Sequence, residues 1–413
     1  RTAESVFENR GEFIFKYAPG KPQRRQEGKK VKDVFKIGVI GCGDISTRNY
    51  VPNIMDRFSN MEIYALCDLN RERAESLAAA HGIAHVLSLD EIFEDPEIDV
   101  ILNLTNPQVH YELNMRALRS GKHVYSEKPL GLNLKEASDT IALAKEKNLY
   151  VGCAPDVFLG AGVQTCRKVI EDGLIGDILS AKVANMYHGP ENIHPAPDFF
   201  YKIGAGPMLD IGPYGISEML YFMGPAEELC CYGGIGINPR PIKDHYTDVE
   251  VNTHYNGIVK FADGRCASVN FSWDTWGAEN GPCVQVYGTK GSLFLSDPDN
   301  YGEGSRVHVL LEEDMRDDNG KISREKTSHS GEYKKDIPLV FDCPTENRGL
   351  GLCEMIEAIK EGRPSRANGE FACHVTEVLD GFNIAIATGK PYKMQTTFQQ
   401  ISRMPEDFVS KMR

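Results

Sequence analysis

The stretch Phe35-Lys-Ile-Gly-Val-Ile-Gly-Cys-Gly-Asp-Ile-Ser46 decides the fold. It opens with an apolar run typical of a buried strand, which leads directly into Gly41 and Gly43. Two glycines allow a tight turn and a close approach to a pyrophosphate, which the free N–H groups of a following helix would also bind. Ser46 stands at the third glycine of the G-x-G-x-x-G fingerprint, so the prediction depends on the strand and helix around the motif. We expect a dinucleotide to contact Gly41, Gly43, Asp44 and Ile45.

An acidic residue follows the second predicted strand, at residues 63–67. Asp68 can accept hydrogen bonds from both hydroxyls of an adenosine ribose, and its charge would repel the 2′-phosphate of NADP. The next residue is Leu69 and not the arginine that favours NADP, although Arg71 and Arg73 keep NADP as the alternative. The sequence therefore predicts an NAD site. An ordinary strand-to-helix turn, in which Asp68 only caps the helix, is the competing interpretation.

Short apolar runs alternate with helical stretches from residue 35 to residue 155. This alternation is typical of right-handed βαβ units on a parallel sheet. The predicted fold class is α/β, with an N-terminal Rossmann dinucleotide-binding domain at 35–155. We expect strands at 35–40, 63–67, 100–104, 123–126 and 149–153, and helices at 45–58, 71–80, 111–119 and 134–147.

The pattern changes after residue 156 to alternating, β-branched segments. Ala262-Asp-Gly-Arg265 and Gly288-Thr-Lys-Gly291 are hairpin signals, which indicate a largely antiparallel sheet. We expect strands at 178–187, 249–261, 266–273, 284–287, 292–295 and 307–311, and helices at 351–360 and 374–387. Residues 156–413 are therefore predicted to form an α+β domain with a large, mostly antiparallel open sheet, for substrate binding and oligomerisation.

Composition and charge narrow the function classes. The 413 residues include 46 Lys and Arg against 59 Asp and Glu, a net charge of −13, and 41% of them are hydrophobic. These values fit a folded globular protein and disfavour binding to nucleic acid or to an anionic membrane. No apolar run reaches the roughly 18 residues that a membrane span needs. The 11 cysteines include no C-x-x-C pair, which predicts reduced thiols in a cytoplasmic protein.

Residues 1–34 precede the first strand and are predicted to form an N-terminal extension. Residues 1–36 carry ten Lys and Arg and five Asp and Glu, a charge of +5, which leaves 36 basic and 54 acidic residues, or −18, for the remainder. The interpretations are a solvated leader, an arm on the acidic body of its own or a neighbouring subunit, or a basic tail for nucleic acid. Deletion of an arm of this kind is predicted to reduce oligomer stability or cofactor retention.

Further motifs follow the dinucleotide motif in order. They are Thr105-Asn-Pro107 with His110, Tyr125-Ser-Glu-Lys-Pro-Leu130, Gly204-Ala-Gly-Pro-Met-Leu-Asp-Ile-Gly-Pro-Tyr214, and the closing segments 354–362 and 374–389 with Pro364. Together these residues resemble the Gfo/Idh/MocA oxidoreductases from residue 35 to about residue 395. The resemblance implies a Rossmann domain that carries NAD(P), and an open antiparallel sheet whose inner face covers the nicotinamide and the substrate. The outer face of that sheet often forms a dimer, so we expect a homo-oligomer, either a dimer or a tetramer.

The substrates implied by the resemblance are sugars, inositols and related polyols, handled as alcohol/ketone pairs. Removal of a hydride from an alcohol carbon needs an acceptor for the hydroxyl proton. The resemblance places Lys128 against the reacting oxygen, where the cationic nicotinamide and partial burial are expected to lower its pKa. Glu127 is expected to contact the nicotinamide ribose or to orient Lys128, and Pro129 to form a cis peptide. The expected cofactor contacts here are Thr105, Asn106, His110, Glu127 and Lys128.

Tyr214 departs from the family pattern, in which a histidine is common at this position. A phenol can transfer the substrate proton only where a neighbouring cation lowers its pKa, and Lys128 is the expected cation. Asp210 is expected to orient this pair or to bind a sugar hydroxyl. The predicted catalytic residues are therefore Lys128, Asp210 and Tyr214. Helix capping and packing by Asp210 and Tyr214 is the alternative.

A loop rich in histidine and aromatic residues precedes the glycine-rich segment, and its side chains suit stacking on a sugar ring. Asp156 follows the fifth predicted strand in a similar position. The predicted substrate-binding residues are Lys128, Asp156, Tyr187, His194, Asp210 and Tyr214, with a plain surface loop as the alternative for the loop residues. The histidines are scattered, so no metal site is predicted.

The sequence thus predicts an NAD-dependent oxidoreductase that acts on a hydroxyl or ketone of a sugar, glycoside or cyclitol. Two alternatives stay open. One is a non-catalytic regulatory protein that binds NAD and a sugar, and the other is an NAD-dependent glycosidase that oxidises its substrate transiently. Incubation with a panel of sugars separates them by NADH accumulation, sugar release without net NADH, or neither.

Overall fold

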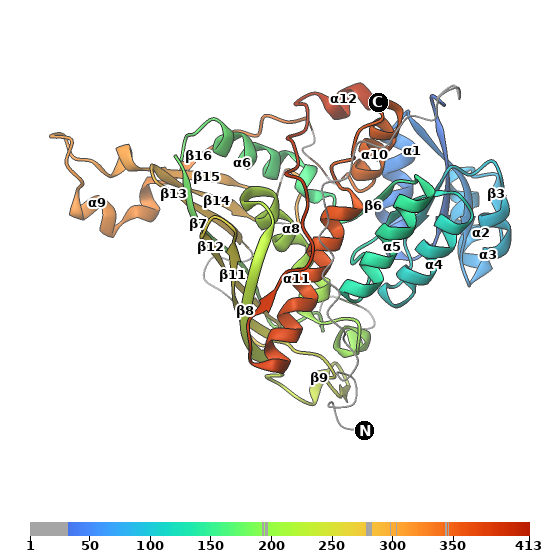
Figure 1. The fold of residues 1–413 in the computed structure, drawn as a ribbon, viewed down its shortest axis with the longest axis horizontal. Coiled ribbons are helices and arrows are strands. Elements are labelled where there is room, and N and C mark those ends of the chain that lie inside the picture. Colours follow the sequence, from blue (N-terminus) through green and yellow to red (C-terminus); the bar gives the residue numbers. More distant parts are fainter. Residues whose placement is uncertain are drawn as a thin grey trace.

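The computed structural model describes residues 32–191, 194, 197–277, 283–297, 299–302, 304–342, 345 and 347–413. The predicted extension at 1–34 lies outside the described residues except for 32–34, where the Lys32 ammonium pairs with the Asp99 carboxylate at 2.8 Å. A parallel sheet and a mostly antiparallel sheet lie side by side (Figure 1). Within the described residues, no helix combines the length and the apolar composition that crossing a membrane requires.

The N-terminal half is a six-stranded parallel sheet in the order β3-β2-β1-β4-β5-β6. Its strands are β1 (Phe35–Ile40), β2 (Met61–Cys67), β3 (His85–Val86), β4 (Val100–Asn103), β5 (His123–Ser126) and β6 (Val151–Cys153). Its helices are α1 (Val51–Arg57), α2 (Arg71–His81), α3 (Leu89–Glu94), α4 (Pro107–Arg119) and α5 (Leu134–Lys147). The strand order reverses between β1 and β4, which is where open α/β sheets bind ligands at their carboxyl ends. The predicted Rossmann fold is confirmed.

The strands of this sheet are buried along nearly their whole length, because helices cover both faces. Ile37 and Val39 share a hydrophobic cluster with residues of α1 and α2. Ile40 and Ile101 belong to a second cluster, together with residues of α4 and α5. Because neighbouring positions of a strand point to opposite faces, the continuous apolar run of β1 is explained by burial on both sides.

The sequence prediction missed β3 and α3, which are both short. The signal for α3 was the spacing of Ser88 and Glu91, because Ser88 accepts the Glu91 backbone N–H while Glu91 accepts that of Ser88. The helix expected from residue 45 begins instead with a π-helical turn, Ser46–Tyr50, and continues as α1. The predicted stop at Gly82 is confirmed, since this residue ends α2 with a φ of 69°.

The C-terminal half contains a nine-stranded sheet in the order β16-β15-β14-β13-β7-β12-β11-β8-β17. The strands are β7 (Ile178–Met186), β8 (Ala226–Gly234), β11 (His254–Phe261), β12 (Cys266–Ser272), β13 (Cys283–Gly288), β14 (Gly291–Ser296), β15 (Val307–Leu311), β16 (Lys335–Asp336) and β17 (Tyr392–Lys393). Every neighbouring pair is antiparallel except β7 and β12. A separate pair, β9 (Arg240–Ile242) and β10 (His245–Thr247), completes the strands of this half.

Both predicted hairpins are confirmed, since β11 pairs with β12 and β13 with β14. The strand expected at 249–261 is shorter than predicted and begins only at His254. The strand β8 was not predicted. Two glutamates and two glycines interrupt its apolar alternation, which explains why the pattern gave no signal.

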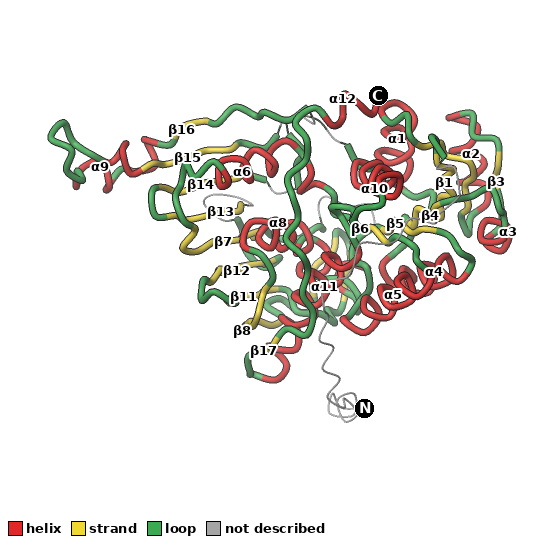
Figure 2. The backbone as a smooth tube through the Cα atoms, turned by 45° about the horizontal axis from the view of Figure 1, so that its top comes forward, coloured by secondary structure: helices red, strands yellow, loops and turns green. Residues whose placement is uncertain are grey.

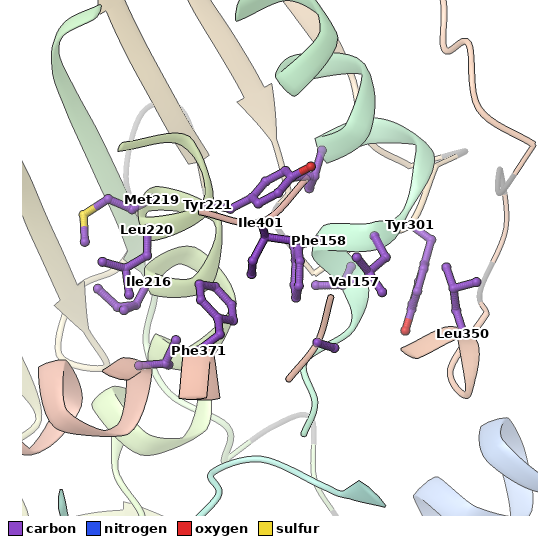
Figure 3. Packing of buried hydrophobic residues seen from close by; sticks show 14 of the residues in the cluster. Val157, Phe158, Ile216, Met219, Leu220, Tyr221, Tyr301, Leu350, Phe371 and Ile401 are labelled. Atoms are coloured by element: carbon purple, nitrogen blue, oxygen red, sulfur yellow. The ribbon is translucent and has the colours of Figure 1, made fainter. Parts of the chain in front are cut away.

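Helices cover one face of the large sheet, and aromatic side chains pack together near the centre of the molecule. These helices are α6 (Ala161–Glu171), α7 (Pro207–Asp210), α8 (Gly212–Met223) and α11 (Gly369–Thr388), whereas α10 (Leu350–Glu361) contacts β6 of the Rossmann sheet. Figure 3 shows Phe158, Tyr221 and Phe371 from three segments packed together, with Phe158 ring centroids 5.3 Å from those of Tyr221 and of Phe371. The chain before α11 also returns to the Rossmann sheet, because the Cys153 N–H donates to the Ala367 oxygen at 3.1 Å. The halves are thus joined through the C-terminal helices.

An extension carries α9 (Arg324–Ser328) away from the body of the molecule. It leaves the sheet after β15 and returns at β16, and it projects from the body in both the ribbon and the tube view (Figures 1 and 2). The last helix, α12 (Phe408–Met412), ends beside α1 instead, where the Ser59 N–H donates to the Met412 oxygen at 2.7 Å.

Candidate active site

The glycine loop after β1 has the geometry that a dinucleotide requires. Gly41 has a φ of 100°, and a Cβ there would lie 2.7 Å from the backbone oxygen of Leu104, so only glycine fits. At Gly43 a Cβ would meet nothing within 4 Å, which leaves the backbone approachable from outside. Asp44 is exposed and lies 3.6 Å from the Arg48 guanidinium. The loop therefore fits a pyrophosphate at Gly43, and the contacts of Asp44 and Ile45 stay a prediction.

Asp68 lies at the carboxyl end of β2 and is fixed beside this loop. Its Oδ2 accepts the Cys42 N–H at 2.7 Å, and its Oδ1 accepts the Asn70 N–H at 2.8 Å. Each oxygen retains a lone pair, so the carboxylate can also accept ribose hydroxyls. Of the two arginines behind the NADP alternative, Arg71 pairs with Glu75 at 2.8 Å along the surface of α2.

The segment after β4 stabilises the site mainly through hydrogen bonds within the protein. Thr105 donates its hydroxyl to Asn103 at 2.6 Å, and Asn106 is exposed at the start of α4. His110 is fully buried, with Nδ1 2.8 Å from the Pro129 oxygen and Nε2 2.9 Å from the Thr105 oxygen. Burial lowers its pKa. The predicted cofactor contact of His110 is therefore corrected, because the ring is used to join the Thr105 loop to the segment that carries Lys128.

Glu127 follows β5 and uses both carboxylate oxygens within the protein. Oε2 accepts the backbone N–H of Lys128 at 2.9 Å, and Oε1 accepts the Tyr50 hydroxyl at 2.8 Å. Two roles were predicted for Glu127, and the contact with the Lys128 N–H corresponds to the one in which Glu127 orients Lys128. The Lys128–Pro129 peptide is cis, as predicted.

The Lys128 ammonium reaches from the end of β5 to the end of α7. Nζ lies 2.9 Å from Asp210 Oδ1 and 2.6 Å from the Asp210 backbone oxygen. Burial alone would lower the pKa of Lys128, but the Asp210 carboxylate together with Tyr214 and Glu127 raises it above its usual range. The predicted lowering of this pKa is wrong for the protein as described, because a carboxylate is in direct contact with the ammonium.

Tyr214 lies in the first turn of α8. It is partly buried, and all the remaining residues of this helix are buried. The Lys128 ammonium lies over the Tyr214 ring, 5.2 Å from its centroid. The hydroxyl accepts a hydrogen bond from Arg348 Nη2 at 3.4 Å. Burial raises the pKa of Tyr214, while Lys128 and Arg348 oppose this rise. The structure thus brings Lys128, Asp210 and Tyr214 together and adds Arg348, which the sequence analysis missed.

Asp156 lies beneath the site. Its side chain is only 1% exposed, Oδ1 accepts the Tyr301 hydroxyl, and Oδ2 accepts the Gly351 N–H at 2.8 Å. Burial raises its pKa to about 6. The predicted substrate contact of Asp156 is corrected accordingly, because both oxygens are engaged in joining β6 to the start of α10.

The two predicted loop residues occupy different surroundings. The Tyr187 ring packs edge-on against Trp273 at a centroid distance of 6.5 Å, and burial together with the Asp210 carboxylate raises the pKa of its phenol. The His194 ring packs edge-on against Phe199 and Phe200, at centroid distances of 5.3 and 5.1 Å. The roles of Tyr187 and His194 in substrate binding stay predictions. Among the residues that the structure describes, no three His, Cys, Asp or Glu side chains are grouped to hold a metal ion.

Comparison with known families decides the assignment. Residues 35–154 match the oxidoreductase family with an NAD-binding Rossmann fold, and residues 163–294 match the GFO/IDH/MocA C-terminal domain. The chain belongs to the Gfo/Idh/MocA oxidoreductase family. As a member of this family it is an NAD(P)-dependent oxidoreductase, and its Rossmann domain binds NAD.

Several relatives with assigned activities are similar to this Gfo/Idh/MocA chain. The 1,5-anhydro-D-fructose reductase of Ensifer adhaerens is 27% identical over 260 residues, which cover 62% of this chain and 74% of that protein. The levoglucosan dehydrogenase of Pseudarthrobacter phenanthrenivorans is 25% identical, with 78% and 84% covered. The myo-inositol 2-dehydrogenase of Thermotoga maritima is 24% identical, with 68% and 84% covered.

Solved structures of similar fold cover nearly the whole Gfo/Idh/MocA region. A levoglucosan dehydrogenase in complex with NADH and levoglucosan has a TM-score of 0.73 at 20% identity, and covers 87% of this chain and 99% of its own. The aldose-aldose oxidoreductase from Caulobacter crescentus has a TM-score of 0.71 at 18% identity, with 87% and 99% covered. These likenesses show the two-part fold.

Proposed function

We propose that the protein moves a hydride between NAD and a carbinol carbon of a sugar, glycoside or cyclitol. The substrate class is supported by the similar proteins named for anhydrofructose, levoglucosan and myo-inositol. The single observation that carries the site is the 2.9 Å contact of Lys128 Nζ with Asp210 Oδ1. It places an ammonium and a carboxylate next to Tyr214, at the junction of the Rossmann sheet with the antiparallel half.

The proposed chemistry divides between the cofactor and these side chains. Bound nicotinamide supplies the hydride acceptor in the oxidative direction. The Lys128 ammonium donates to the substrate oxygen and stabilises its negative charge as the hydride leaves. Lys128 can pass a proton to Asp210 while it takes the hydroxyl proton, so the pair changes its protonation by one proton in total. Tyr214 shares the substrate proton with Lys128. Glu127 fixes the backbone of Lys128 by accepting a hydrogen bond from its N–H.

We propose NAD in preference to NADP. The support is the Asp68 carboxylate, which is fixed beside the glycine loop where a 2′-phosphate would bring two further negative charges. Leu69, which follows it, is fully exposed and offers no positive charge at this position.

A homo-oligomer, dimer or tetramer, is proposed to form through the open face of the nine-stranded sheet. Helices cover the opposite face, whereas Tyr232 is 77% exposed and lies beside Asn256 of the adjacent strand β11. Two residues further along β11, Ile258 is also exposed on this face. Light scattering coupled to size exclusion tests this, because a Tyr232→Glu/Ile258→Glu variant should shift to monomer. We also propose a cytoplasmic location, supported by ten described cysteines that are all free thiols.

Incubation of the purified protein with NAD and a panel of sugars, glycosides and cyclitols tests the proposal. NADH accumulation with at least one member supports it. Sugar release without net NADH would indicate a glycosidase instead. NAD binding without either product over the whole panel would favour a non-catalytic regulator.

A further inference from the structure

The loop in front of α10 is attached to the helix that follows the glycine loop. Arg57 of α1 donates from Nη1 to the Thr345 hydroxyl at 2.9 Å and to the Asn347 side-chain oxygen at 2.8 Å. The Asn53 side-chain amide, also in α1, donates to the Arg348 backbone oxygen at 3.4 Å. The backbone position of Arg348 is therefore set by the dinucleotide-binding half of the molecule.

The Arg348 side chain points into the other half. Its Nη2 lies 3.4 Å from the Tyr214 hydroxyl oxygen and 3.3 Å from Asp299 Oδ1, and the side chain is 16% exposed. Tyr214 belongs to α8, and Asp299 to the segment between β14 and β15. Arg348 thus connects three segments: its backbone is held by α1, and its guanidinium contacts the helix that carries Tyr214 and an acidic loop at the edge of the site.

The chemistry of a guanidinium fixes the direction of the contact with Tyr214. An arginine only donates hydrogen bonds, so the phenol oxygen accepts the bond and directs its own hydrogen away from Arg348. The charged groups that act on Tyr214 are the cations Lys128 and Arg348 and the carboxylates Asp299 and Glu127. Lys128 lies over the ring, and Arg348 lies at the hydroxyl. Arg348 is therefore placed to stabilise negative charge on the oxygen itself.

We propose that Arg348 is a positioning residue for proton transfer, which holds the Tyr214 oxygen. In the oxidative direction it stabilises the phenolate that accepts the substrate hydroxyl proton, and in the reductive direction the phenol hydrogen points away from Arg348, toward the substrate oxygen. This inference rests on the proposed function of the same site. It gives this chain a cation at the phenol oxygen, the atom that must carry the negative charge during proton transfer. Burial raises the pKa of Tyr214, so loss of Arg348 should raise it further.

The test removes the charge and follows Tyr214 itself. In Arg348→Met, the Tyr214 resonance of protein labelled with [ζ-13C]tyrosine should titrate at higher pH than in wild type, with Tyr214→Phe used to assign the signal. Sugar oxidation should fall at least about tenfold near neutral pH and recover partly as the pH rises. The NAD dissociation constant should stay within about threefold of wild type. Arg324→Met, on the distant extension, is the matched control and should change none of these three quantities.

Two comparisons separate positioning from a merely structural role. In a Tyr214→Phe background, Arg348→Met should add less than about a threefold loss, because the two residues act on one proton. If Arg348→Met does not fold, Arg348→Gln provides the same comparison with a smaller change of shape. An unchanged Tyr214 titration and pH profile in the charge-removing variant would overturn the proposal. A loss of turnover that is equally large in the wild-type and Tyr214→Phe backgrounds would overturn it as well. Because the resonance titration needs no substrate, it distinguishes failure of this inference from failure of the proposed function.

Discussion

Lys128 and Asp210 hold each other at the junction of the two halves, with Nζ 2.9 Å from Oδ1 and 2.6 Å from the Asp210 backbone oxygen. The two residues are 82 positions apart, and they come from the end of β5 and the end of α7. The contact keeps Lys128 protonated despite its burial, since the carboxylate raises the pKa of the ammonium. In the proposed mechanism, catalysis by this pair therefore begins from an ion pair and not from a neutral amine.

Replacement of Lys128 tests the role of the ammonium. Lys128→Ala should lower turnover by about 10²- to 10⁴-fold, because the variant has neither the charge at the substrate oxygen nor the proton carrier. Calorimetry should show that NAD still binds. Lys135→Ala removes a lysine on the surface of α5 and is the matched control, with wild-type turnover expected. Wild-type turnover in Lys128→Ala would reject the assignment.

Tyr214→Phe removes the hydroxyl and keeps the packing of the ring. Turnover should fall at least about tenfold, which corresponds to roughly 1.4 kcal/mol of barrier, without a change in melting temperature. Tyr214→His should retain partial activity, because imidazole is the group that the family commonly uses there. If Tyr214→Phe turns over like wild type, the phenol only packs, and the proton leaves through Lys128 and Asp210 or through a loop residue such as His194.

Gly41 and Gly43 should respond differently to alanine. Gly41→Ala places a methyl group 2.7 Å from the Leu104 oxygen at a φ of 100°, so it should destabilise the fold by about 1–3 kcal/mol. Gly43→Ala meets no atom within 4 Å and should leave the melting temperature unchanged. It should nevertheless weaken NAD binding at least about tenfold, because the methyl group stands where the pyrophosphate approaches. Unchanged NAD binding in Gly43→Ala would place the cofactor elsewhere.

Asp68 is expected to control the choice of cofactor. Asp68→Ala should weaken NAD binding more than NADP binding, because the carboxylate holds ribose hydroxyls and repels the 2′-phosphate. The variant also loses the acceptor of the Cys42 and Asn70 N–H groups, so its melting temperature must be measured alongside. A wild-type protein that uses NADP better than NAD would contradict this assignment.

Asp156 should make stability depend on pH in an unusual direction. Its pKa is about 6 in the folded chain against 3.8 for an ordinary aspartate, because burial disfavours the charge. The folded state then binds the proton more tightly than the unfolded state, so this group's contribution to the unfolding free energy falls as the pH rises through this range. Asp156→Asn removes the effect and should gain stability relative to wild type between about pH 4 and about pH 6. If the difference in unfolding free energy between the two proteins stays constant across this range, Asp156 is not the titrating group.

The elements of the fold that the sequence predicts correctly are those marked by local sequence patterns. The apolar run of β1, the αL stop at Gly82 and the hairpin at Ala262–Arg265 depend only on neighbouring residues. The short elements β3 and α3 gave too few residues for a periodic signal, although the spacing of Ser88 and Glu91 marked the start of α3.

The site was predictable only in part, because burial and long-range contacts decide it. Lys128, Asp210 and Tyr214 were identified by resemblance, and the structure brings them together. Arg348 lies 134 positions from Tyr214, and no local pattern reveals that it reaches the phenol. His110 and Asp156 have the right chemistry and position along the chain, but tertiary packing covers both side chains and engages their polar atoms.

Direct transfer of hydrogen from a substrate carbon to NAD tests the central claim most directly. The purified protein is incubated with NAD and a substrate identified in the panel, deuterated at the carbinol carbons, and the reduced cofactor is analysed by mass spectrometry. Our account predicts one deuterium in each reduced nicotinamide, with the signal abolished in Lys128→Ala and retained in Lys135→Ala. Reduced cofactor without deuterium, or an undiminished signal in Lys128→Ala, would contradict it.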